Sequence, residues 1–190
     1  MTTTETVLGE RADLLQSLAK ARHFLRYTVR DLTDEQAAEL TTASELCLGG
    51  LIKHVALTER QWVNFILDGP SAMGNWDEAS MGEGWSDAFH MRGGETLAGV
   101  LDEYERVARR TDELVATLPD LEAAHPLPEA PWFEQGTRWS ARRVLLHVIA
   151  ETAQHAGHAD IIRESLDGAK SMGQRSSYGG AWSEGERHAS

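Results

Sequence analysis

Four segments of this chain carry apolar residues at helical spacing, and no stretch shows the sustained alternation of a strand. The spacing predicts long helices over residues 10–29, 44–67, 95–118 and 141–166. A length of 190 residues with 41% apolar content suits one domain that has a sizeable core. Four amphipathic helices without strands bury their apolar faces by packing against each other. The sequence therefore predicts an all-α fold, an up-and-down-type four-helix bundle with long connecting loops.

Local signals mark where the predicted helices begin and end. Thr33 opens a capping box and predicts a short extra helix. Ser140 is the expected N-cap of the last helix, and Gly168 is its expected C-terminal glycine. Residues 169–190 are rich in Gly and Ser and have no apolar period, so they are either disordered or wrapped over the body. We therefore divide the chain into a bundle at 1–168 and a tail at 169–190.

Three residues on two predicted helices form a candidate metal site. Glu151 and His155 are four positions apart, so they share one helix face and can reach one cation. His54 is the best third ligand, because the helix around it is otherwise largely apolar. Two histidines and one carboxylate leave coordination positions open, which is typical of a catalytic metal. The plain alternative is that Glu–His pairs at this spacing are also frequent on exposed helix faces.

Two more histidines continue the same face of the last predicted helix. His147 lies one turn before Glu151, and His158 follows His155 by three positions. His158 is a candidate fourth ligand, proton shuttle or support for a ligand, and His147 is a candidate partner of Glu151. We predict that both take part in catalysis beside the metal, with support of the ligands as the favoured role.

Other polar residues receive structural interpretations. Cys47 lies two turns before His54, and a lone helical cysteine is usually a small buried hydrophobe. Glu59 is expected to pair with Arg60 or another surface base. The remaining histidines have no partner at ligand spacing and are expected at the surface: His23, His90, His125 and His188.

The charge balance limits the classes of partner. A formal net charge of −12 and a pI near 5.0 argue against nucleic acid and anionic membranes. A single cysteine excludes an intramolecular disulfide and fits a reducing interior. Without a secretory leader or an apolar run of membrane-spanning length, we expect a cytoplasmic protein.

Two segments carry a resemblance to a known family. His54 with Glu59, and the stretch from residue 138 to 164, resemble the DinB-like superfamily of metal-binding four-helix bundles. The branch most similar is that of mycothiol-dependent enzymes, the S-transferases and maleylpyruvate isomerases. The resemblance extends from the first helix to Gly168. It implies a divalent metal held by His54, Glu151 and His155, with zinc as the first expectation and iron, nickel or manganese as alternatives. It also implies a homodimer.

The resemblance further implies an enzyme that activates a mycothiol-like thiol, its cosubstrate, for transfer to a small electrophile. A free thiol with a pKa of ~8.5 is mostly protonated at neutral pH, and coordination to a metal ion deprotonates it. The loop of residues 70–94 is longer than a bundle requires, which favours a lid over the site. Tryptophans of the loops are candidate walls for the cosubstrate, although packing is the commoner role of such residues: Trp76, Trp85, Trp132 and Trp139.

Two other functions remain open. One is a metal-dependent hydrolase or isomerase that acts through metal-bound water and needs no thiol. The other is a non-catalytic, stress-related protein that binds a metal or ligand without turnover. Activity that requires a thiol would distinguish the thiol-transferring enzyme from the hydrolase or isomerase and from the binding protein.

Overall fold

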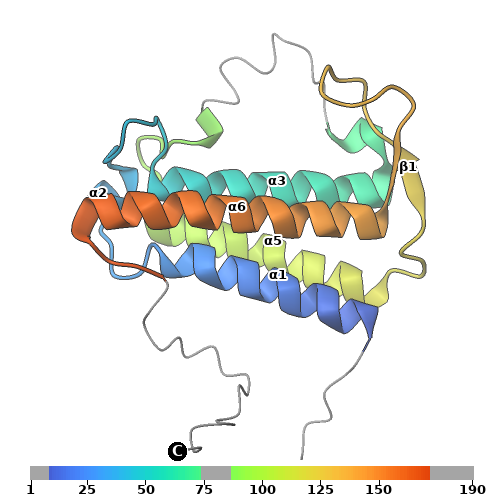
Figure 1. The fold of residues 1–190 in the computed structure, drawn as a ribbon, viewed down its shortest axis with the longest axis horizontal. Coiled ribbons are helices and arrows are strands. Elements are labelled where there is room, and N and C mark those ends of the chain that lie inside the picture. The colour runs from blue at the N-terminus through green and yellow to red at the C-terminus, as the bar shows by residue number, and fades with distance from the viewer. Residues whose placement is uncertain (1–8, 74–86, 172–190) are drawn as a thin grey trace, which may run out of the picture.

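The computed structural model describes residues 9–73 and 87–171. Four long helices lie side by side as a bundle: α1 (Glu10–Tyr27), α3 (Leu48–Asp68), α5 (Leu97–Thr117) and α6 (Ala141–Asp167) (Figure 1). Each helix packs against two others, so that α1 and α3 are diagonally opposed. The predicted all-α four-helix bundle is confirmed. None of the described helices is long and apolar enough to cross a membrane.

The helix directions do not alternate strictly along the chain. Lys53 on α3 pairs with Glu95, just before α5, and Arg60 on α3 pairs with Glu103 on α5, so the two helices are parallel. Because α3 and α5 run in the same direction, the end of α3 and the start of α5 lie at opposite ends of the bundle (Figure 1). The order is up, down, down, up, and as a result α6 lies antiparallel to α3.

Helix ends agree with the sequence within a few residues. The short helix α2 (Asp34–Ala38) carries the predicted capping box at Thr33. Helix α3 begins at Leu48, later than predicted, because the Ser44 hydroxyl accepts a hydrogen bond from a nearby backbone N–H and holds a turn there. Ser140 caps α6 as expected, and Gly168 ends it in the left-handed conformation with φ 78°.

Small elements that the sequence did not predict flank the bundle. A 3₁₀ turn, η1 (Pro70–Met73), follows α3 directly. Strands β1 (Ala124–Pro126) and β2 (Arg138–Ser140) pair antiparallel and lead straight into α6. Each strand has three residues, too few to show alternation in a sequence. This ribbon fixes the point at which α6 begins.

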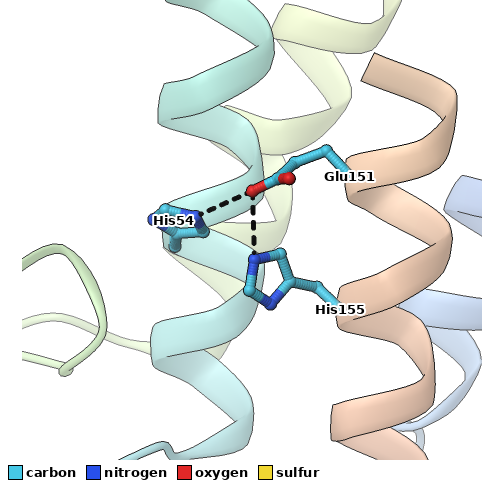
Figure 2. Close-up of side chains that lie close together, drawn as sticks. All are labelled: His54, Glu151 and His155. Carbon is cyan, nitrogen blue, oxygen red and sulfur yellow. Dashed lines mark hydrogen bonds and ion pairs between the residues drawn. The ribbon is translucent and has the colours of Figure 1, made fainter. Parts of the chain in front are cut away.

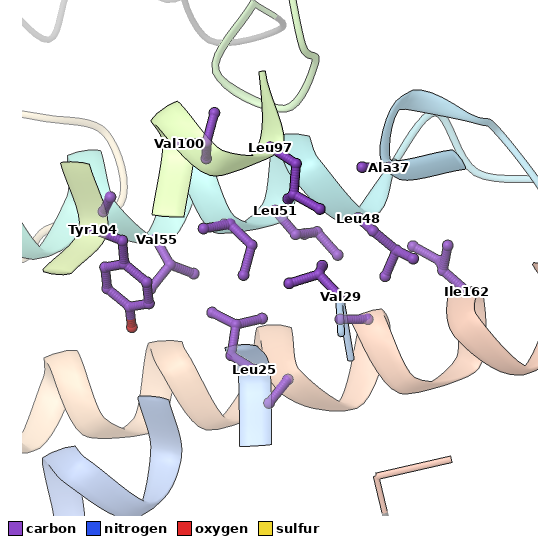
Figure 3. Packing of buried hydrophobic residues seen from close by; sticks show 14 residues of the cluster. Leu25, Val29, Ala37, Leu48, Leu51, Val55, Leu97, Val100, Tyr104 and Ile162 are labelled. Atoms are coloured by element: carbon purple, nitrogen blue, oxygen red, sulfur yellow. The ribbon is translucent and has the colours of Figure 1, made fainter. Parts of the chain in front are cut away.

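Two apolar clusters fill the bundle. One gathers around Leu25, Leu51 and Tyr104 (Figure 3). The other surrounds Phe65 and Val144 toward the opposite end. Six of the buried polar side chains lie around the middle of α3, where the two clusters meet: Arg22, His54, Glu59, Thr111, Thr152 and His155.

Glu59 is one of these buried residues, and its expected pairing at the surface was wrong. Its side chain is fully buried, and Arg22 Nε donates a hydrogen bond to it at 3.2 Å. The Thr111 hydroxyl donates a second at 2.5 Å, whereas Arg60 pairs with Glu103 at 2.9 Å. The reason is that α3 contacts both neighbouring helices, so the face five positions from His54 is buried as well. Burial alone would lower the pKa of the Arg22 guanidinium, but the charge of Glu59 raises it above its usual value.

Candidate metal centre

The antiparallel packing of α3 and α6 brings the three predicted ligands together (Figure 2). Oε1 of Glu151 lies 3.2 Å from His155 Nε2 and 3.5 Å from His54 Nε2. The two imidazole rings meet edge to face with centroids 4.8 Å apart. One carboxylate oxygen therefore faces the outer nitrogens of both histidines.

Burial and charge set the state of this cluster. His54 and His155 are buried, whereas the Glu151 side chain is 24% exposed. Hydrogen bonds from His155 and then His54 hold the pKa of Glu151 far below its usual range, against the opposing effect of burial. Glu151 is thus an ionised carboxylate at the boundary between the core and solvent.

The donor set fits a divalent cation. His54, Glu151 and His155 each offer one ligand atom, and these atoms lie within 4.8 Å of one another. Two imidazole nitrogens and one carboxylate oxygen suit zinc and related first-row ions. Among the described residues this is the one group of three or more His, Cys, Asp or Glu side chains that meets such a distance limit.

Other side chains surround the ligand cluster, from α3, from α6 and from the connection before α5. Nδ1 of His158 lies 3.3 Å from Nδ1 of His155, on the side of the ring away from Glu151. The Thr58 hydroxyl lies 3.5 Å from His54 Nε2. The ring of Phe89 stacks on the His54 ring with centroids 3.9 Å apart. His158 thus lies where a residue that orients His155 would lie.

His147 lies farther along α6, among aromatic rings. Its ring meets Trp62 and Trp139 edge to face, with centroids 4.9 and 5.2 Å away. Burial lowers the pKa of His147, although the charge of Glu151 acts in the opposite direction. The charge of Glu151 therefore acts on His147. Because its pKa is lowered, the imidazole of His147 is neutral at pH 7.

The tryptophans predicted to contact a cosubstrate fall into three situations. Trp139 stacks on Trp62 with centroids 5.0 Å apart and is half-buried, as a packing residue would be. Trp132 is 47% exposed and meets Phe133 edge to face. Trp76 and Trp85 lie outside the described residues.

The remaining histidines stand apart from the cluster. His23, His90 and His125 are half-buried rather than fully at the surface. His23 stacks on Tyr27, and His125 packs against Phe65. His188 lies outside the described residues.

Three neighbours of the site were missed in the sequence. Thr58 and Trp62 follow His54 by four and eight positions, and this spacing was a usable signal that they share its helix face. Phe89 reaches His54 from a connection between helices. No periodic pattern could have placed it there.

Comparison with known proteins adds to this geometry. No curated protein matches the chain. A solved structure of a conserved protein from Enterococcus faecalis superimposes with a TM-score of 0.63 at 13% identity, covering 86% of this chain and 100% of that one. This likeness shows the fold. A family model described as mycothiol-S-transferase matches residues 13–168, which includes all four long helices almost completely. By this match, the chain belongs to the mycothiol-S-transferase family.

Proposed function

We propose that this protein is a metal-dependent enzyme that transfers a mycothiol-like thiol to a small electrophile. The observation that carries the proposal is the cluster of His54, Glu151 and His155 within a chain of this family. The cluster supplies three ligands for one cation and leaves coordination positions open. The family to which the chain belongs supports a mycothiol-like thiol as the cosubstrate.

Each residue of the cluster has a role in this proposal. A divalent cation bound by the three residues would lower the pKa of a coordinating thiol, so that the thiol reacts as thiolate. Glu151 contributes the negative charge that offsets the cation. His158 holds the ring of His155 through the nitrogen that does not face the metal site. These contacts would fix the reacting sulfur in one place.

His147 is the residue that we propose to accept the thiol proton. Its lowered pKa keeps the imidazole neutral and able to take a proton at pH 7.

Sulfur then displaces the leaving group of the electrophile, forming one S–C bond as one bond from carbon to the leaving group breaks. Trp132 and Trp139 remain proposed contacts of the cosubstrate, together with Trp76 and Trp85.

The test is an assay with mycothiol and chlorodinitrobenzene, in which the S-conjugate is measured by absorbance as chloride leaves. We expect conjugate formation by the zinc-loaded protein above the spontaneous rate, and none with the chelated protein or with His155→Ala. Failure of every electrophile in a panel, although metal is bound, would support the non-catalytic alternative. Turnover of esters or amides without any thiol would support the hydrolase instead.

We also propose zinc as the resident metal, a homodimer as the assembly and the cytoplasm as the location. Elemental analysis of protein purified without added metal tests the first, and light scattering on a sizing column tests the second.

We propose that residues 1–168 form the functional bundle. Removal of residues 169–190 should therefore leave metal binding unchanged.

A further inference from the structure

The segment around Phe89 is held against the beginning of α3 by several contacts. Lys53 Nζ donates a hydrogen bond to the His90 carbonyl at 3.1 Å. The Cys47 thiol, itself the N-cap of α3, lies 3.6 Å from the Phe89 carbonyl. Two backbone carbonyls of this connection are therefore held by the N-cap residue of α3 and by a lysine on the helix itself.

The contact requires a glycine at position 50. A Cβ on Gly50 would lie 1.7 Å from the Phe89 carbonyl oxygen and 2.2 Å from its carbon. Because those atoms belong to backbone, no side-chain rotation relieves the overlap. The neighbouring Gly49 differs, since a Cβ there would meet the flexible Met91 side chain at 2.2 Å. Gly50 alone of this pair sets how closely the connection approaches α3.

This approach places the Phe89 ring on a proposed ligand. The Phe89 and His54 rings stack with centroids 3.9 Å apart and an interplanar angle of 21°. The Phe89 centroid also lies 6.0 Å from that of His155. An apolar ring thus covers one face of His54 and borders the ligand cluster. A stacked ring limits rotation of the imidazole, so less conformational freedom remains to be lost when a ligand binds.

We propose that Gly50 and Phe89 act together as positioning residues for His54: Gly50 admits the backbone of the connection, and the Phe89 ring then holds the imidazole ready for the metal. This proposal rests on the proposed metal role of His54. Neither a glycine nor a phenylalanine side chain can ligate a metal, yet both residues would affect the affinity for it. The two residues should act through one mechanism.

The experiment is titration of the metal-free full chain with Co²⁺, following the visible spectrum, in competition with a chelator. Phe89→Leu keeps an apolar side chain but removes the stack, and Phe89→Tyr keeps the ring. Gly50→Ala moves the connection away. Gly157→Ala is the matched control, because Gly157 is a helical glycine two positions after His155, where a Cβ would meet nothing within 4 Å.

We expect Phe89→Leu and Gly50→Ala each to weaken Co²⁺ binding by about tenfold, the lower end of the effect of residues that orient metal ligands. Both should alter the Co²⁺ spectrum, whereas Phe89→Tyr and Gly157→Ala should match the unchanged protein. The double variant should bind no more weakly than either single variant, because the two changes break the same contact. Unchanged affinity and spectrum in Phe89→Leu would overturn the proposal, as would additive losses in the double variant.

The same variants separate this proposal from the assignment of function. In the metal-free protein, the ring current of Phe89 shifts the NMR signals of the His54 imidazole, and Phe89→Leu should move them. If the signals move but no metal binds, the metal site is wrong and the stacking stands. If metal binds tightly but no thiol is conjugated, the reaction is wrong, and the Co²⁺ titration still decides the positioning role. Signals that do not move would overturn the stack itself.

Discussion

Glu59 and Glu151 are two carboxylates inside one bundle, and their surroundings differ. Glu59 is fully buried and receives hydrogen bonds from the Arg22 guanidinium and the Thr111 hydroxyl. Glu151 is 24% exposed and faces two imidazoles, which are uncharged unless they take up a proton. A guanidinium carries a permanent charge and cannot ligate a metal, whereas a neutral imidazole can. The negative charge of Glu59 is balanced by the positive charge of Arg22. Glu151 is instead surrounded by groups that can bind a cation together with it.

The difference shows how a structural buried charge is distinguished from a functional one. Arg22 also pairs with Asp112 at 2.7 Å, so the polar atoms of the Glu59 cluster are occupied. In the Glu151 cluster the nitrogens that face the carboxylate are the same atoms that would ligate a metal. Changes at Glu59 should therefore affect folding, and changes at Glu151 should affect binding.

The largest expected effect is on folding, in Arg22→Met. Removing the guanidinium leaves the buried Glu59 carboxylate without a countercharge, which costs about 3–5 kcal/mol of unfolding free energy. Urea denaturation followed by circular dichroism measures it. The double variant Arg22→Met with Glu59→Leu should recover most of the loss. A loss under about 1 kcal/mol in the single variant would show that the pair does not matter to stability.

The next largest effect is on metal binding, in His155→Ala. Loss of one of three ligands should weaken zinc binding by more than about 100-fold, equivalent to about 2.7 kcal/mol. Competition with a chromogenic chelator measures the affinity. The bundle should remain folded, because the apolar clusters hold it. The Arg22→Met, Glu59→Leu double variant serves as control and should keep its zinc; stoichiometric zinc in His155→Ala would refute the ligand assignment.

A smaller effect on binding is expected for Glu151→Gln. The amide keeps an oxygen donor of the same shape but loses the negative charge, so affinity should fall by about tenfold, or about 1.4 kcal/mol. The rate of thiol conjugation should fall further, since under the proposed function the negative charge of Glu151 would also affect the reactivity of a thiol held at the metal site. Affinity and rate are measured on one preparation. Equal losses in both would mean that Glu151 serves only to bind the metal.

The smallest effect concerns pH and His147. Burial lowers the pKa of this imidazole, so below about pH 6.5 the unfolded chain takes up a proton that the folded chain resists. Stability attributable to His147 is therefore present above that pH and is lost as the pH falls through the folded pKa. Comparing urea unfolding at pH 7.5 and 5.5, His147→Gln should lose less stability than the unchanged chain, by under about 1 kcal/mol. An identical pH dependence in both proteins would contradict the shift.

Elements with a strong local signal were predictable from the sequence. The α6 helix has a hydroxyl cap at Ser140 and a glycine at its end, and both act as predicted. His54, Glu151 and His155 lie on periodic helices, so their spacing already placed them on apolar faces. The structure brings one ligand atom of each within 4.8 Å of the others, and their role as metal ligands stays a prediction.

Features that depend on contacts between distant segments were not predictable. The Arg22–Glu59 pair joins the diagonally opposed helices α1 and α3 across the core, and the sequence does not state which buried side chains meet there. The stack of Phe89 on His54 depends on the path of a connection with no period. The parallel direction of α3 and α5 likewise depends on how two whole helices pack, and no single residue determines it.

The arrangement of α3 and α6 also has a consequence for synthesis. His54 on α3 emerges from the ribosome well before Glu151 and His155, which belong to α6, the last of the four bundle helices. Domains fold as units once enough chain is available, and two of the three ligands are missing until nearly all of this one has been translated. A metal held by these three residues could therefore bind only after α6 has been made, so it could not guide the early steps of folding of the bundle.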